Sequence, residues 1–195
     1  MATSNKKWGV NNSPTDKVKV VLFVSRHKDN KDLDNYEERR MSFITDKEPD
    51  DKYILNKFNH FVEDGVTGEL SRMYFSVNTR YLPTVRKQLI HFLIDEDDFN
   101  LCSIQSKIAG IAAKKECAAE KKWMIDYDGP EERITECEQD LWNAVKDGII
   151  EYKTPNGYAI VIPHGFDCRE FCEKWKDIAT IKKDDMLCVR WERKQ

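Results

Sequence analysis

The sequence lacks long apolar runs and carries no strong excess of charge of one sign. No apolar stretch approaches the roughly 20 residues that a membrane-spanning helix needs, so we expect no such helix. Residues 1–16 are polar and lack the apolar centre of a secretory signal, which predicts a flexible tail on a protein that is not exported. With 32 basic and 35 acidic residues, the formal net charge is −3. That balance excludes a strongly basic protein that coats DNA without regard to sequence.

Closely spaced cysteine pairs are also missing. None of the 6 cysteines forms a C-x-x-C pair, and the two nearest are Cys168 and Cys172. This spacing does not suit a zinc site. Together with the polar amino terminus, it favours reduced thiols in the cytoplasm.

Apolar residues make up 40% of the chain, enough for a core beneath a heavily charged surface. Strand and helix patterns alternate along residues 17–195, which predicts a single α+β domain. We expect strands at 17–27, 39–45, 72–78, 123–127, 157–163 and 186–191, and helices around 54–62, 83–95, 102–120, 131–146 and 167–175.

A pair of acids ends the apolar segment Trp123-Met-Ile-Asp-Tyr-Asp. Because residues i and i+2 of a strand point to the same side, Asp126 and Asp128 are expected to present two carboxylates to one point. Two neighbouring carboxylates repel each other unless a cation or a proton compensates. Mg²⁺ or Mn²⁺ is the natural cation, because hard ions prefer oxygen ligands. The alternative is a solvated strand end running into the turn at Gly129.

A tight-turn signal, Pro155-Asn-Gly, precedes the next apolar strand. It predicts that Lys153, Thr154 and the backbone N–H groups of Asn156 and Gly157 lie at the mouth of that strand. Such a turn beside two metal-binding acids suits the oxygens of a triphosphate. A helix separates the two apolar strands, so we expect a β-α-β unit with the strands as neighbours.

Alternation in the amino-terminal half places Arg72, Tyr74, Asn78 and Arg80 on one face of a strand. Arginine with tyrosine and asparagine can bind phosphates and stack on or hydrogen-bond bases. These residues are therefore candidates for nucleic-acid binding. The alternative is the solvent face of a half-buried strand.

The order of an acid pair on a strand, a helix, and a T-x-N-G turn entering an apolar strand resembles the archaeo-eukaryotic primase superfamily, the primase-polymerases. The stretch is most similar to small phage-encoded proteins with a primase-like core. The matching segments fall within about residues 120–190 and are Trp123 to Asp128, Thr154 to Tyr158, Pro163 with Phe166, and Ile181 to Leu187. The resemblance implies an RRM-like core whose mixed or antiparallel sheet is packed by helices.

In that superfamily, paired acids and a third carboxylate hold a divalent metal, and a histidine in the second motif contacts the phosphates of the incoming nucleotide. The resemblance therefore implies a Mg²⁺ or Mn²⁺ site at Asp126, Asp128 and Asp185, with Asp184 and Asp167 as alternatives for the third acid. Ala159 stands where the family has the histidine, and His164 is the one nearby substitute.

Three functions are left open. The first is a metal-dependent nucleotidyltransferase that binds a nucleotide triphosphate and nucleic acid. The second is a catalytically inactive primase-like protein that binds nucleotide, nucleic acid or a host protein in the cytoplasm of the host cell. The third is a phosphatase of the haloacid-dehalogenase type, because Asp126-Tyr-Asp128-Gly129 is similar to its nucleophile loop.

Overall fold

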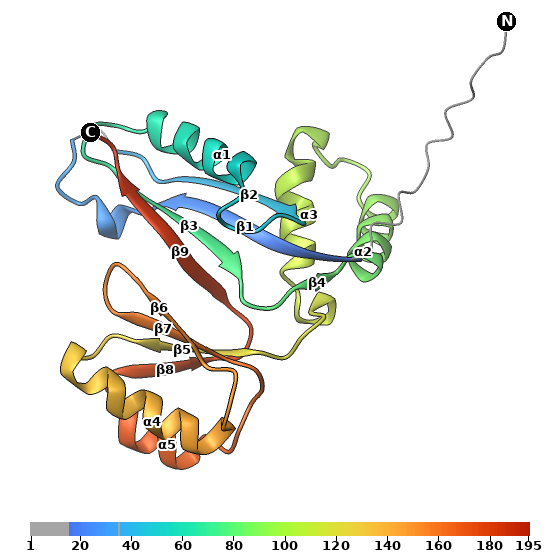
Figure 1. Ribbon diagram of the computed structural model, residues 1–195. Helices are drawn as coiled ribbons and strands as arrows, with labels where there is room; N and C mark the ends of the chain where they lie inside the picture. The colour runs from blue at the N-terminus through green and yellow to red at the C-terminus, as the bar shows by residue number, and fades with distance from the viewer. Residues whose placement is uncertain (1–15, 35) are drawn as a thin grey trace, which may run out of the picture.

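Two antiparallel sheets with helices packed on them make up the computed structural model, which describes residues 16–34 and 36–195 (Figure 1). The strands are β1 (Lys17–Ser25), β2 (Arg39–Thr45), β3 (Leu70–Ser76), β4 (Arg80–Tyr81), β5 (Trp123–Tyr127), β6 (Ile150–Lys153), β7 (Tyr158–Ile162), β8 (Ala179–Lys182) and β9 (Met186–Arg193). The helices are α1 (Lys52–Glu63), α2 (Leu82–Asp95), α3 (Ile104–Ala112), α4 (Ile134–Val145) and α5 (Arg169–Trp175).

The larger sheet has the strand order β2-β1-β3-β9, with β4 pairing beside β1, and the smaller has the order β6-β7-β5-β8. Every described pair of strands is antiparallel. The α+β class is thereby confirmed. The predicted tail, residues 1–16, lies outside the described residues except for Asp16.

Each sheet buries one face against amphipathic helices. On the larger sheet, α1 packs Ile54, Phe58 and Phe61 against a core that includes Phe23 and Phe75. The spacing of these helical residues is the one that the sequence shows, because positions three and four apart share a helix face. The opposite face of the larger sheet is partly covered by α2 and α3.

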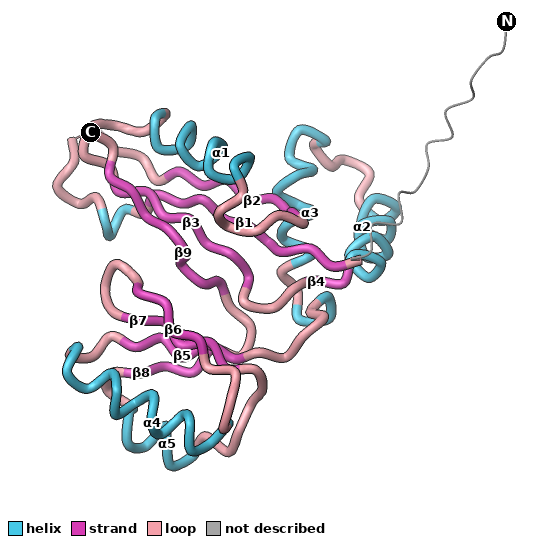
Figure 2. The backbone as a smooth tube through the Cα atoms, in the orientation of Figure 1, coloured by secondary structure: helices cyan, strands magenta, loops and turns pink. Residues whose placement is uncertain are grey.

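The outer face of the smaller sheet is covered by α4 and α5 (Figures 1 and 2). Its core contains Ile125 and Tyr127 of β5, Ile160 of β7, Leu141 of α4 and Trp175 of α5. Since α1 lies outside the larger sheet and α4 with α5 lies outside the smaller one, the two sheets face each other across the middle of the molecule.

Three short strands, β4, β6 and β8, were not predicted, and β6 changes the expected β-α-β unit. After α4 the chain enters β6, which pairs with β7 as an antiparallel hairpin. The strands β5 and β7 are neighbours, as predicted, but the extra strand makes their pairing antiparallel. β6 (Ile-Glu-Tyr-Lys) and β8 (Ala-Thr-Ile-Lys) alternate apolar and polar residues, but each is only four residues long, too short for the pattern to stand out.

The predicted helix over 102–120 is shorter than expected. α3 ends at Ala112, and the backbone at Lys114 is extended. Here the chain leaves the helix so that Ala118 can bridge to Arg80 and the Ala119 N–H can donate to the Thr79 carbonyl at 2.8 Å. A tertiary contact therefore overrides the local helical preference.

Candidate functional site: a charged cleft between the sheets

A cleft of about 380 Å³ lies between the two sheets. From the smaller sheet, the β6–β7 turn and the β8–β9 connection it is lined by Met124, Asp126, Asp128, Thr154, Asn156, Ala159 and Asp185, and from the start of β9 by Met186. From the larger sheet and its loops it is lined by Leu22, Val24, Arg26, Lys28, Glu38, Arg40, Arg72, Tyr74 and Cys188. One wall thus carries three aspartates, and the other carries four cationic side chains and one glutamate.

The strand β5 places the acid pair. Ile125 and Tyr127 are fully buried against α4 and α5, so Asp126 between them faces the cleft. Asp128 follows the last residue of the strand, and its N–H donates to the Ile178 carbonyl at 2.8 Å. Both carboxylates line the cleft, as the i and i+2 spacing predicts.

The carboxylate of Asp126 lies in an unfavourable electrostatic setting. Burial raises the pKa of Asp126, and the charges of Asp128 and Asp185 raise it further, with Lys182 and Lys28 offsetting only part of the effect. Among residues 16–34 and 36–195, neither Asp126 nor Asp128 has a side-chain hydrogen bond or an ion pair. A bound cation would remove this repulsion.

Of the three candidates for a third acid, only Asp185 lines the cleft. Its Oδ1 accepts from the Met186 N–H at 2.7 Å, and its Oδ2 lies 3.8 Å from Lys182 Nζ. Asp167 is exposed and bound to Arg169, whose Nε donates at 2.9 Å, beside a different pocket.

Asp184 is held in the junction between the sheets, which we define as Asn78, Arg80, Lys122 and Asp184. Arg80 donates to both carboxylate oxygens of Asp184, at 2.8 and 2.9 Å, and Asn78 Nδ2 donates to Oδ1 at 3.1 Å. Asn78 also exchanges hydrogen bonds with the backbone of Lys122, at 2.8 and 3.0 Å. The Arg80 side chain is 2% exposed.

The junction changes the interpretation of the predicted nucleic-acid face. Arg72 and Tyr74 lie on β3 and line the cleft, as the alternation predicts. The strand ends at Ser76, however, so Asn78 and Arg80 leave that face and bind Asp184 instead. Asn78 and Arg80 are only 1% and 2% exposed, so they do not present a surface to nucleic acid.

The turn between β6 and β7 reaches the cleft. Its Thr154 N–H donates to the Gly157 carbonyl at 2.9 Å, and Thr154 and Asn156 line the cleft. A Cβ on Gly157 would lie 2.2 Å from the Tyr127 carbonyl oxygen, so glycine lets the turn pack directly behind the acid pair. Lys153 is exposed and is not among the residues that line the cleft.

His164 follows β7, at the end of that strand away from the β6–β7 turn. Its side chain is exposed, and Nδ1 lies 3.0 Å from the Gly165 carbonyl oxygen. Ala159 instead pairs directly with Asp126 in the sheet and lines the cleft. His164 therefore does not take the place that the family's histidine would occupy in this register.

The cations Arg26, Lys28 and Arg40 of the cleft were not among the predicted site residues. Arg26 and Lys28 follow β1, and Arg40 lies on the edge strand β2. A basic pattern after an apolar strand hints at the first two, but only the pairing of β1 with β3 brings them beside Arg72. No sequence signal singles out Arg40.

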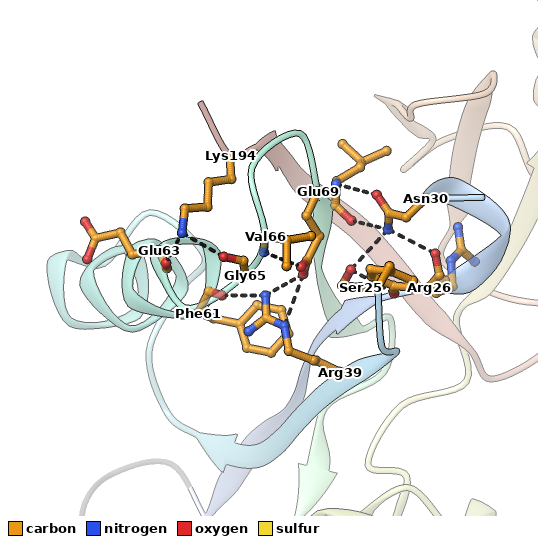
Figure 3. A network of polar contacts seen from close by, with 12 residues as sticks. Ser25, Arg26, Asn30, Arg39, Phe61, Glu63, Gly65, Val66, Glu69 and Lys194 are labelled. Carbon is orange, nitrogen blue, oxygen red and sulfur yellow. Dashed lines mark hydrogen bonds and ion pairs between the residues drawn. The ribbon is translucent and has the colours of Figure 1, made fainter. Parts of the chain in front are cut away.

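A buried polar network fixes the loop after β1, which carries Arg26 and Lys28 (Figure 3). Asn30 Nδ2 donates to Ser25 Oγ at 3.1 Å and to the carbonyls of Arg26 and Leu70 at 3.0 and 3.2 Å, and its Oδ1 accepts from the Leu70 N–H at 2.6 Å. These bonds tie the loop after β1 to the start of β3, and so hold Arg26 at the cleft.

A buried ion pair lies next to Asn30 in the same view (Figure 3). Glu69 is 2% exposed and binds Arg39, whose Nε donates at 3.1 Å, and the Val66 N–H at 2.9 Å. Burial alone would raise the pKa of Glu69, but the hydrogen bonds from Arg39 and Val66 outweigh it and hold the pKa below its ordinary value.

The described residues give no complete metal centre and no membrane helix. No group of three or more His, Cys, Asp or Glu side chains among them is arranged to hold a metal ion by itself. No described helix is both long and apolar enough to cross a membrane. Asp126 and Asp128 still fit a magnesium-type ion, which commonly takes one or two carboxylates and completes its shell with waters and substrate phosphates.

Comparisons with known proteins add no relative. A scan against protein-family models, a search of curated proteins and a search of solved structures each find no match for this chain. The geometry of the cleft is therefore the structural basis from which a function can be inferred.

Proposed function

We propose that this chain is a primase-like protein that binds a nucleotide triphosphate and nucleic acid in the cleft with the help of Mg²⁺ or Mn²⁺. The observation that carries the proposal is the opposition of charge across the cleft. Asp126 and Asp128, which have no side-chain partner among the described residues, lie on one wall, and arginine and lysine side chains lie on the other. This arrangement suits a polyphosphate, which needs a cation beside the acids and basic groups around its remaining oxygens.

Asp126 and Asp128 would hold the cation, which would neutralise phosphate charge when bound, and Asp185 lines the same cleft without forming a three-carboxylate site with them. Arg72 contributes a rigid cationic group, since its Nη2 donates to Asp29 at 2.6 Å and its side chain is 4% exposed. The β6–β7 turn offers the Thr154 hydroxyl and the Asn156 amide as further hydrogen-bonding groups.

Ala159 favours nucleotide binding over nucleotidyl transfer. It lies opposite Asp126 and carries only a methyl group, so it offers no hydrogen bond to a phosphate. Nucleotide binding is the function that the cleft supports best. Nucleotidyl transfer is the second candidate, favoured by the three acids that line one wall.

The phosphatase alternative fits the cleft less well. In that mechanism the first aspartate of the pair attacks phosphorus as a carboxylate. Metal binding and nucleophilic attack both need the carboxylate form of Asp126, so its raised pKa does not distinguish the two functions. Four cationic side chains across a wide cleft, however, exceed what a single phosphate group needs.

The test is calorimetric titration of the full chain with Mn²⁺ and dATP. Wild type is expected to bind the metal and nucleotide, and Asp126→Asn is expected to weaken this binding by at least about tenfold, because one charged metal ligand is lost. Asp167→Asn is the matched control, since it removes an exposed acid outside the cleft and is expected to leave affinity unchanged.

Equal affinity in wild type and Asp126→Asn, or binding that persists in excess chelator, would contradict the proposal. Extension of a primed template by the wild type, lost in Asp126→Asn, would establish the second candidate as well. Release of phosphate from p-nitrophenyl phosphate, lost in the same variant, would favour the phosphatase.

A further inference from the structure

A second, more open groove of about 700 Å³ continues the cleft at the carboxyl end of β9. The two spaces share Arg72 and Asn156. Trp191 lines the groove and is 38% exposed, so its indole ring is available to a ligand. The β6–β7 turn, through Pro155 and Asn156, forms the opposite side.

A bulge in β9 places Trp191 on the face of the cleft. Tyr74 pairs with Cys188 and Arg72 pairs with Trp191, so four residues of β9 span three of β3, and the register shifts between Met73 and Tyr74. Residues directly opposite each other in a sheet project to the same side. Arg72 lines the cleft, and Trp191 therefore points the same way. A regular strand would have turned Trp191 to the other face.

Two arginines, Arg72 and Arg193, and two acids, Asp29 and Glu192, line this groove, and both acids have further arginine neighbours. Asp29 is shared by Arg72, whose Nη2 donates at 2.6 Å, and by Arg26, whose Nε donates at 3.0 Å, so one acid lies between two cations. Glu192 lies 3.5 Å from Arg190. Arg193 adds a further guanidinium at the rim.

We propose that Trp191 is a stacking platform for an unpaired nucleobase, and that a single strand of nucleic acid runs from the cleft over this residue. The inference deepens the proposed function and rests on it. Arginine side chains beside an exposed aromatic ring are a combination that binds single strands, because the guanidinium groups attract phosphates while every base can stack on the ring. Tyr74, on the same face of the sheet, lies deeper in the cleft.

The test compares wild type, Trp191→Ala and Trp191→Phe by fluorescence anisotropy with a labelled oligothymidylate of about 12 nucleotides. Measurements are made at about 50 mM salt, where phosphate contacts are strong. Trp191→Ala is expected to weaken binding by about 5- to 100-fold, the range that one lost base–aromatic stack produces. Trp191→Phe keeps a π-face and is expected to stay within about threefold of wild type.

Two controls separate stacking from a general effect on the protein. Trp142→Ala removes a tryptophan that is 51% exposed on α4, on the far side of the smaller sheet, and is expected to bind like wild type. An oligomer of the same length without bases carries the same phosphates, and Trp191→Ala is expected to bind it as tightly as wild type does.

An unchanged affinity of Trp191→Ala for the oligothymidylate would overturn the inference, and so would an equal loss with the oligomer that lacks bases. Titration of each variant with Mn²⁺ and dATP distinguishes this failure from that of the proposed function. If nucleotide binding is normal and metal-dependent but Trp191→Ala does not change oligothymidylate affinity, only the stacking role of Trp191 is refuted. Trp191-dependent oligonucleotide binding without any nucleotide binding would refute the proposed triphosphate site alone.

Discussion

The carboxylates of the cleft and those of the buried ion pairs have opposite surroundings. Glu69 and Asp184 each bind an arginine and at least one further donor of the chain. Among the described residues, Asp126 and Asp128 bind no side chain at all, although Asp126 is partly buried. The paired acids, Glu69 and Asp184, therefore stabilise the fold, whereas Asp126 and Asp128 do not form ion pairs within the described residues.

This contrast indicates which acids are available to a ligand. A buried carboxylate with an arginine partner is already neutralised, and a metal or a phosphate-bound cation would have to compete with that arginine. Carboxylates that repel one another in a cleft gain stability when a cation binds, and such perturbed groups are typical of functional sites. The junction and the cleft lie at the same meeting of the two sheets, yet only the cleft has this property.

The largest effect on stability is expected when one partner of the junction is removed. Arg80→Met leaves Asp184 partly buried without its cation, and is expected to lower the free energy of unfolding by about 3–5 kcal/mol. Urea unfolding of the full chain measures this loss. The double variant Arg80→Met with Asp184→Leu is expected to recover most of it, because both charges are then absent.

Asp126→Asn is the matched variant in the cleft, and it is expected to show no loss of stability. A loss as large as that of Arg80→Met would show that the cleft acids also hold the fold together. The distinction between the two kinds of acid would then be wrong.

A second variant tests the backbone behind the cleft acids. Gly157→Ala would place a Cβ 2.2 Å from the Tyr127 carbonyl oxygen, so the turn or the end of β5 must move. We expect a loss of about 1–3 kcal/mol in the free energy of unfolding. Binding of Mn²⁺ with dATP is also expected to weaken, since Asp128 follows Tyr127 directly.

Gly110→Ala is the control for this change. No atom lies within 4 Å of a Cβ at Gly110, which is in α3. Alanine there is expected to raise stability by about 0.5–1 kcal/mol, because glycine is a poor helix former. If Gly157→Ala were equally well tolerated, the turn would not be tightly packed against the acid pair.

The pH dependence of stability distinguishes the paired acid Glu69 from the cleft acid Asp126. The pKa of Glu69 is lowered on folding, so its contribution to stability is present above the unfolded pKa of about 4.3 and is lost as the pH falls through the folded value. Glu69→Gln is therefore expected to be less stable than wild type at pH 7, by about 1–3 kcal/mol. The difference should shrink in acid.

The sign is reversed for Asp126, because its pKa is raised on folding. Its contribution is present below the unfolded pKa of about 3.9 and is lost as the pH rises through the folded value. Asp126→Asn is therefore expected to gain on wild type between acid and neutral pH, by less than about 1 kcal/mol. Thermal unfolding across this pH range, without divalent cations, measures both trends. Parallel trends for the two variants would contradict the assigned surroundings.

Much of the fold could be predicted because apolar periodicity is a local property of the chain. The pattern of Ile54, Phe58, Phe61 and Val62 defines α1, and all four are buried as expected. The strands β1, β2, β5 and β7 likewise follow from their apolar runs. The short strands β6 and β8 were not predicted, because an alternation over only four residues is a weak signal and their pairing depends on neighbouring strands.

The candidate site divides in the same way. The spacing of Asp126 and Asp128 predicts two carboxylates on one side of a strand, and the Pro-Asn-Gly turn predicts a tight connection nearby. Which acid accompanies them depends on contacts distant in sequence, since Arg80, 104 residues earlier in the chain, binds Asp184 and leaves Asp185 in the cleft. Nothing local in the sequence distinguishes these two neighbouring aspartates.

The sequence by itself determined the α+β class, the faces that the main helices bury, and the side of β5 from which the acid pair projects. These features depend on residue spacing within one helix or strand. Only the tertiary structure decided that two sheets would face each other, that Arg26, Lys28 and Arg40 would lie opposite the acids, and that a bulge would turn Trp191 toward them. Those outcomes depend on the pairing of strands from distant parts of the chain, and strand register is set by the whole packed sheet rather than by any one segment.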